Sequence, residues 1–259
     1  MVYFEYIKNA FRSQLRYRLN WGMRLFGNFV SIYFQICLWT ALLESREGIV
    51  ELDYMLSYIL ASAMIQSLII TNTVGIINGK INSGQIAMDF IKPIRFRLFM
   101  FCESVGNSLF SFIFTYLPLT LVITIIYKCY DFWINMDLFF LASVCLGMYL
   151  YFSIAYCLGL TSFWGTLTWI LERFLNDVVS LFSGRLIPVF LLPAIVFSWN
   201  KWLPFQYIYY SPISMLLNSK ETGEKLTVLI IQAAWCILFT VLGMVIERKG
   251  MHKLQIQGG

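Results

Sequence analysis

The chain has 259 residues, of which 59% are hydrophobic and only 13% are charged, and its formal net charge is +5. Soluble domains carry about 25% charged residues, so this chain lacks the polar surface that a soluble enzyme, a disordered regulator or a small disulfide scaffold needs. Because a membrane-spanning helix takes about 20 apolar residues, the composition predicts an all-α polytopic membrane protein that occupies residues 1–259 as a single transmembrane domain.

Residues 1–24 precede the first long apolar run and predict an amphipathic helix in the membrane interface. Phe4, Ile7, Phe11 and Leu15 recur at helical spacing on one face, beside a neighbouring face of cations. Such a helix would place its apolar face in lipid and its cations among the headgroups. A simple topology signal is the alternative interpretation.

Long uncharged runs set the expected spans. Six transmembrane helices are predicted, at about residues 25–43, 54–78, 104–127, 138–163, 167–187 and 226–246. The fifth is the least regular, because charged residues lie in its first turns and near its far end, and a re-entrant hairpin is the alternative. With six spans, 13 Lys and Arg residues fall on one side and 5 on the other. The positive-inside rule then predicts that both termini lie in the cytoplasm. The membrane is expected to be the plasma membrane of the cell.

Between the second and third spans, residues Gly79–Arg97 predict a short amphipathic helix in the cytoplasm. Ile86, Phe90 and Ile91 would form its apolar face, and Pro93 would end it. Such a surface suits the docking of a cytoplasmic partner, with charges at its rim adding specificity, whereas a solvated connector is the alternative. The residues expected to couple to that partner are Gly84, Ile86, Asp89, Phe90, Ile91, Lys92 and Pro93.

Residues 188–218 are too apolar for a free loop and too often interrupted by proline for a span. Irregular backbone at membrane depth is tolerated only where it is buried in protein or lines a cavity. We therefore expect short re-entrant helices that cover the outer end of a pathway. The residues assigned to this outer gate are Gly184, Arg185, Pro188, Pro193, Pro204 and Pro212.

These two segments together resemble the type-2 ATP-binding-cassette (ABC) exporter permeases. Ser83–Pro93 is similar to the cytoplasmic loop of that family, and Ser183–Pro212 is similar to the re-entrant element before its last helix. The six-span layout with an interfacial N-terminal helix matches as well. The resemblance implies a permease that forms a pathway with a second permease chain, as a homodimer or a heterodimer. It also implies a separate cytoplasmic ABC ATPase dimer, which would hold the ATP and magnesium.

No residue pattern indicates chemistry within this chain itself. The single histidine, His252, lies in the polar tail, and the six cysteines form no CxxC pair, so we expect no metal site, no bound cofactor and no catalytic residue. Membrane lipid is an expected partner, and nucleic acid is not.

A self-sufficient secondary transporter or channel is the alternative function. Against it, the ionisable candidates Glu103, Asp177 and Arg185 all lie towards span ends, whereas ion coupling usually needs acids at mid-membrane. The abundant Phe and Tyr would suit amphipathic or cationic cargo, although ordinary lipid-facing and packing aromatics are the simpler interpretation.

Overall fold

The computed structural model describes residues 2–16, 18–45, 51–69, 71–128, 136–165, 168–218 and 221–253, and within these ranges it contains helices and no strand. The all-α prediction is therefore confirmed for the described residues. The long and medium helices are α1 (Val2–Leu15), α2 (Arg18–Ser45), α3 (Leu52–Ile69), α4 (Thr73–Asn82), α6 (Phe96–Ser111), α7 (Leu117–Tyr127), α9 (Leu138–Leu160), α10 (Thr168–Phe182) and α13 (Thr222–Met251). The short ones are α5 (Gln85–Ile91), η1 (Phe112–Tyr116), η2 (Thr161–Trp164), η3 (Val189–Leu191), α11 (Ala194–Asn200), η4 (Phe205–Tyr207) and α12 (Tyr210–Leu217).

Five helical segments of the described chain are long and apolar enough to cross a membrane. They are Trp21–Glu44, Leu52–Asn82, Phe96–Tyr127, Leu138–Trp164 and Thr222–Met251. These segments correspond to the first four predicted spans and to the sixth. The predicted fifth span, 167–187, is not among them, because α10 has 15 residues and rises only about 22 Å, against roughly 30 Å for the hydrocarbon core. The six-span count is therefore not confirmed.

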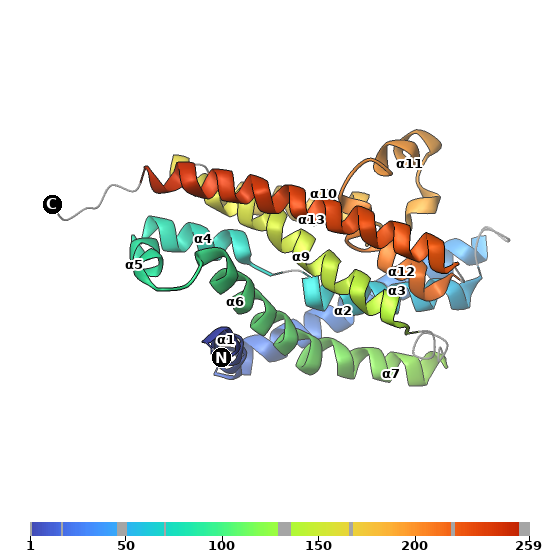
Figure 1. Ribbon diagram of the computed structural model, residues 1–259. Helices are drawn as coiled ribbons and strands as arrows, with labels where there is room; N and C mark the ends of the chain where they lie inside the picture. The colour runs from blue at the N-terminus through green and yellow to red at the C-terminus, as the bar shows by residue number, and fades with distance from the viewer. Residues whose placement is uncertain are drawn as a thin grey trace.

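Helix α9 lies at the centre of the bundle, and α3, α4, α10, α12 and α13 all contact it (Figure 1). Most of its residues from Leu150 to Leu160 are buried. Ser143, near its start, hydrogen-bonds to Gln232 of α13 at 3.0 Å, and Tyr149, farther on, contacts Thr240 of α13 at 3.0 Å. The two helices therefore run parallel, so the chain between them must return along the length of α9.

Helix α1 packs across α6 instead of facing lipid with its whole apolar side. Gly106 of α6 permits the contact, since a Cβ atom there would lie 2.5 Å from the carbonyl oxygen of Ile7. The ring of Phe11 meets an α6 ring edge-on, while Phe4 and Leu15 stay exposed. The predicted interfacial helix thus ends at Leu15, and part of its apolar face covers protein.

Candidate functional site

The predicted cytoplasmic helix is present as α5, the second arm of a hairpin with α4. Gly84, with a φ of 72°, permits the turn between the arms. The helix ends at Ile91, as predicted, because Pro93 forces Lys92 into an extended conformation with ψ of 142°. In Figure 1, the hairpin lies towards the same end of the long helices as α1 and the C-terminal end of α13.

An ion triad around the buried carboxylate of Asp89 closes this hairpin. The carboxylate of Asp89, whose side chain is 2% exposed, accepts hydrogen bonds from the Nζ atoms of Lys80 at 2.8 Å and Lys92 at 2.6 Å. Both ammonium groups also lie over the ring of Phe99, 4.8 and 5.1 Å from its centroid. Burial alone would raise the pKa of Asp89, but the two lysines outweigh it and hold that pKa below its ordinary value. Asp89 is therefore buried between partners that a buried carboxylate requires, whereas Lys92 is 42% exposed. The predicted contribution of these two charges to partner specificity stays a prediction.

The apolar residues of α5 do not share one face. Ile86 is buried, and the half-buried Phe90 packs on the ring of Phe96, with 5.1 Å between the ring centroids. Ile91 is 78% exposed, as expected for a residue about 140° around the helix from Ile86. The predicted patch of Ile86, Phe90 and Ile91 is therefore wrong. The exposed apolar residues of α5 are Met88 and Ile91, which we call the exposed α5 pair. The coupling role predicted for Ile91 stays a prediction.

Arg97 fixes the end of the hairpin segment to the helix bundle. Its guanidinium donates to the carbonyl oxygen of Thr240 at 2.6 Å and to the hydroxyl of Ser153 at 3.0 Å. The rings of Tyr149 and Tyr156 face it at 5.7 and 5.4 Å. The last residue of the predicted cytoplasmic segment is thus buried between α6, α9 and α13.

The predicted outer segment consists of short helical turns separated by proline. Gly184 adopts a φ of 85° and packs so closely that a Cβ atom there would lie 2.8 Å from the hydroxyl oxygen of Tyr58. The four prolines stand at helix starts: Pro188 before η3, Pro193 before α11, Pro204 before η4 and Pro212 in the first turn of α12. The broken helices follow the expected pattern, and their role as an outer gate stays a prediction.

Arg185 finds polar neighbours within the protein. Its Nη1 atom donates to the hydroxyl of Ser180 at 3.1 Å. The hydroxyl groups of Tyr116, Tyr151 and Tyr209 lie within electrostatic range of its guanidinium. An arginine that would be costly in lipid is therefore accommodated among buried tyrosines.

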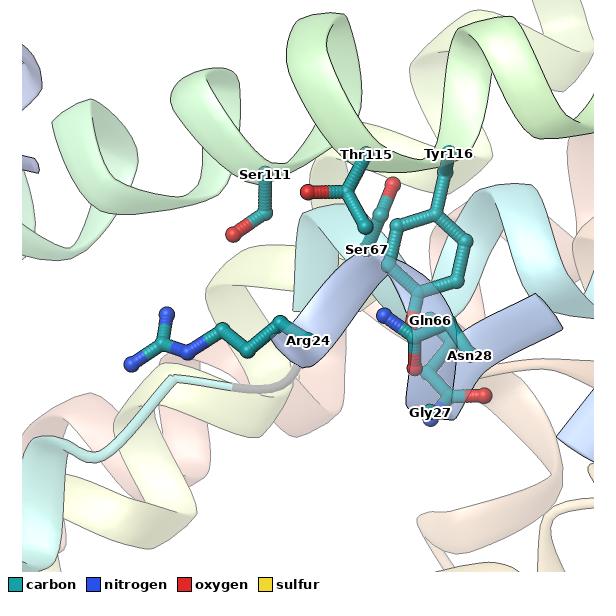
Figure 2. Close-up of a pocket in the computed structure, with 8 residues that line it drawn as sticks. All are labelled: Arg24, Gly27, Asn28, Gln66, Ser67, Ser111, Thr115 and Tyr116. Atoms are coloured by element: carbon teal, nitrogen blue, oxygen red, sulfur yellow. The ribbon is translucent and has the colours of Figure 1, made fainter. Parts of the chain in front are cut away.

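A polar cavity of about 320 Å³ lies between α2, α3 and the α6–η1 segment (Figure 2). Its lining residues, drawn in Figure 2, are Arg24, Gly27, Asn28, Gln66, Ser67, Ser111, Thr115 and Tyr116. Gln66 and Ser67 stand at the middle of the Leu52–Asn82 segment, and Ser111 stands at the middle of Phe96–Tyr127. The cavity is therefore a hydrophilic site at the middle of two segments that are long and apolar enough to cross a membrane.

Both of these segments are irregular beside the cavity. On one wall, α3 ends at Ile69 and α4 begins at Thr73. On the other wall, η1 is a π-helical turn in which the N–H of Leu117 donates to the carbonyl of Phe112. Such π turns and interrupted membrane helices are frequent at binding sites.

Trp21 compensates for the irregular backbone of the second wall. Pro118 has no N–H to donate to the carbonyl of Phe114, four residues earlier in the helix. The indole Nε1 of Trp21 donates to that carbonyl instead, at 3.2 Å. The start of α2 is thereby joined to the η1 wall.

The sequence analysis missed this cavity, although α2 carried a signal for it. Arg24, Asn28, Ser31 and Gln35 recur at spacings of four, three and four residues, which places them on one helical face. Ser31 and Gln35 line a smaller hollow that shares Asn28 and other residues with the main cavity. A polar stripe on an otherwise apolar span indicates a face that does not contact lipid.

A family model described as "ABC-2 family transporter protein" matches residues 29–258. The match includes the hairpin, the outer segment and two of the three cavity walls. No curated protein and no solved structure matches the sequence. Because the family model covers most of the chain, and because the described residues contain several apolar membrane-spanning helices, this protein belongs to the ABC-2 transporter family of membrane proteins.

Proposed function

We propose that this chain is the permease subunit of an ABC exporter, that it forms the substrate pathway with a second permease chain, and that a separate ATPase drives it. The observation that carries the proposal is the position of the hairpin between the two spans that line the cavity. Helix α4 follows α3, and α6 follows α5. A displacement of the hairpin would therefore act on both walls, beside their irregular turns.

The hairpin has the properties that transmission of such a displacement requires. The triad of Lys80, Asp89 and Lys92 joins its two arms, and Arg97 ties its end to the bundle. Met88 and Ile91, the exposed α5 pair, offer an apolar surface. Burying one large apolar side chain stabilises a contact by roughly 1.5–3 kcal/mol, so a partner ATPase that covers the exposed α5 pair would gain substantial affinity.

Two features support the finer topology within this proposal. Residues 168–218 return the chain between the parallel helices α9 and α13, which supports a sixth crossing made by α10 and the proline-rich segment. Helix α1, α5 and the C-terminal end of α13 lie towards one end of the molecule (Figure 1), which supports cytoplasmic termini on the basic side of a cell membrane.

A second permease chain is supported by the surface of α2. Few of its residues are buried within this chain, and Phe26, Phe29, Tyr33 and Phe34 are exposed. In a bilayer such residues face either lipid or another subunit. The exporter direction rests on the resemblance of the hairpin and outer segments to exporter permeases.

The exposed α5 pair provides the test of the proposed function. We expect Ile91→Asp to reduce recovery of the ATPase with the purified permease by about tenfold or more, because loss of one buried apolar side chain changes affinity by that factor. Ile195→Asp is the matched control, since Ile195 is 76% exposed and lies on α11, towards the other end of the long helices (Figure 1). Co-purification of each variant from native membranes gives the measurement.

Undiminished recovery of the ATPase with Ile91→Asp would move the docking surface away from the hairpin. Transport that continues without ATP would contradict the proposal itself and favour the secondary transporter. Phe90 is unsuitable for this test, because it packs on Phe96 and its replacement would disturb the hairpin.

A further inference from the structure

The cavity lining carries a positive charge and no negative charge. Arg24 supplies its only charge, no carboxylate is among the lining residues, and the remaining side chains are amides and hydroxyls. None of the ion pairs formed among the described residues includes Arg24. The positive charge of Arg185 also acts on Tyr116, one of the lining residues. A cavity with this lining suits a ligand that brings negative charge.

Asn28 of α2 supplies a hydrogen-bond donor to the cavity. The hydroxyl of Tyr116 donates to Oδ1 of Asn28 at 3.1 Å, which leaves the amide nitrogen of Asn28 as a donor. Thr115 and Ser67 are buried at the closed end, whereas Arg24 and Gly27 are exposed at the open end. Figure 2 shows Ser111, Thr115 and Tyr116 on one helical segment, with Arg24 extending from α2 on the other side of the cavity.

The open end of the cavity has apolar surroundings. Met23 and Val30, which lie four residues before and three residues after Gly27 and so next to it on the surface of α2, are exposed. A Cβ atom at Gly27 would meet no other atom within 4 Å, so the backbone of α2 leaves space there. Since Trp21–Glu44 is a membrane-spanning segment, a molecule at this opening would contact acyl chains and a cation together.

We propose that the cavity binds the headgroup of an anionic amphiphile, whose phosphate or carboxylate pairs with Arg24 and whose apolar chains lie along α2. The volume of about 320 Å³ is at the lower end of the range for small-molecule pockets. It accommodates a headgroup and leaves the chains outside. This inference rests on the proposed function, because it assigns the amphiphile as the cargo that enters from the bilayer.

Binding to the purified full-length chain in neutral detergent tests this inference without ATP. The probes are a fluorescent phosphatidylglycerol, a phosphatidylcholine with the same chains and label, and unlabelled glycerol 3-phosphate as a competitor without chains. The variants are Arg24→Gln, Arg24→Lys and Arg12→Gln. Arg12 is an exposed arginine of α1 that does not line the cavity.

We expect Arg24→Gln to weaken phosphatidylglycerol binding about tenfold or more, the factor that corresponds to loss of one charged hydrogen bond. Arg24→Lys should retain most of the affinity, Arg12→Gln should match the wild type, and phosphatidylcholine should bind all variants equally weakly. Thr115→Val removes one inner-wall hydroxyl without changing its volume, and it should weaken binding by a smaller factor. Because Arg24 is exposed, its replacement leaves packing intact, and an unchanged thermal unfolding midpoint verifies this.

Two results would overturn the inference. Equal affinity of the wild type and Arg24→Gln for phosphatidylglycerol would remove the anion site. Competition by glycerol 3-phosphate at the concentration where phosphatidylglycerol competes would show that the ligand needs no chains. The ATPase recovery of Ile91→Asp is measured separately, so failure of lipid binding with intact ATPase docking rejects the cargo class alone. Specific lipid binding without ATPase docking rejects the proposed function instead.

Discussion

Lys80, Asp89 and Lys92 in the α4–α5 hairpin satisfy one another, whereas Arg24 in the cavity has no ion-pair partner among the described residues. The two regions are adjacent along the chain, since the spans that line the cavity begin and end at the hairpin. The paired charges fix the shape of the hairpin, and the unpaired charge gives the cavity a capacity to bind. In the proposed function, the hairpin would be the part that the ATPase moves, and the cavity would be the part that receives cargo.

Removing the carboxylate that Lys80 and Lys92 share should reduce stability more than any other change proposed below. Asp89→Ala leaves Lys80, whose side chain is 12% exposed, buried without its counter-ion, and breaking a buried pair in this way costs about 3–5 kcal/mol. Lys92→Ala is the control, because Lys92 is 42% exposed and its removal leaves Lys80 as the counter-ion of Asp89, so it should cost less. Thermal unfolding of both variants, together with their recovery of the ATPase, measures the difference. Equal shifts of the unfolding midpoint in the two variants would show that Lys80 and Asp89 do not behave as a buried ion pair.

The same carboxylate predicts how the hairpin depends on pH. Since the pKa of Asp89 in the folded protein is below its ordinary value of 3.8, its contribution to stability is complete above that value and is lost only as the pH falls through the lower, folded-state pKa. The protonation of Asp89 should therefore not change the recovery of the ATPase anywhere in the neutral and mildly acidic pH range. A loss near pH 6 that Asp89→Ala abolishes would contradict the assignment.

The sequence predicted the elements better than their contacts. Composition and apolar runs predicted the helices, and Pro93 marked the end of α5, because these features are local. The burial of Ile86 and Asp89 depends on α6 and α4, which periodicity within α5 cannot reveal. The cavity was missed because its residues come from three helices, and each of its polar side chains looks unremarkable alone. The short fifth helix reflects Gly184 and Pro188, which end regular structure before α10 reaches the length of a span.

Helix α6, which contributes Ser111 to the cavity wall, packs closely against α1, whereas the hairpin is held together by charge. Gly106 tests the packing between α1 and α6. A Cβ atom at this position would lie 2.5 Å from the carbonyl oxygen of Ile7 and 2.7 Å from Cβ of Ala10, so Gly106→Ala should push α1 away from α6. Overpacking of this kind costs typically 1–3 kcal/mol. Gly79→Ala is the control within helix α4, because a Cβ atom there meets nothing within 4 Å, and it should be neutral or slightly stabilising.

The movement of α1 can be measured directly beside the loss of stability. Gln14 and Asn107 lie in hydrogen-bond contact at 3.0 Å, so a cysteine pair at these positions reports the distance between α1 and α6 through its rate of cross-linking. We expect Gly106→Ala to slow that reaction and Gly79→Ala to leave it unchanged. Unchanged cross-linking in Gly106→Ala would show that α1 adapts without separating, and the packing argument would then fail.

The smallest expected effect concerns the bond that compensates for the irregular wall. Trp21→Phe keeps an aromatic ring against Phe114 but removes the donor to its carbonyl oxygen, at a net cost of about 0.5–1.5 kcal/mol. Pro118→Ala supplies a backbone N–H that can donate to the same carbonyl. The two changes should therefore not be additive: Trp21→Phe should destabilise the wild type, and it should have little effect in the Pro118→Ala background. Titration with SDS in mixed micelles gives the four unfolding free energies of this double-mutant cycle, and the difference between backgrounds is the coupling energy. If Trp21→Phe costs the same in both backgrounds, Trp21 stabilises the wall through its ring alone, and the carbonyl of Phe114 is satisfied without it.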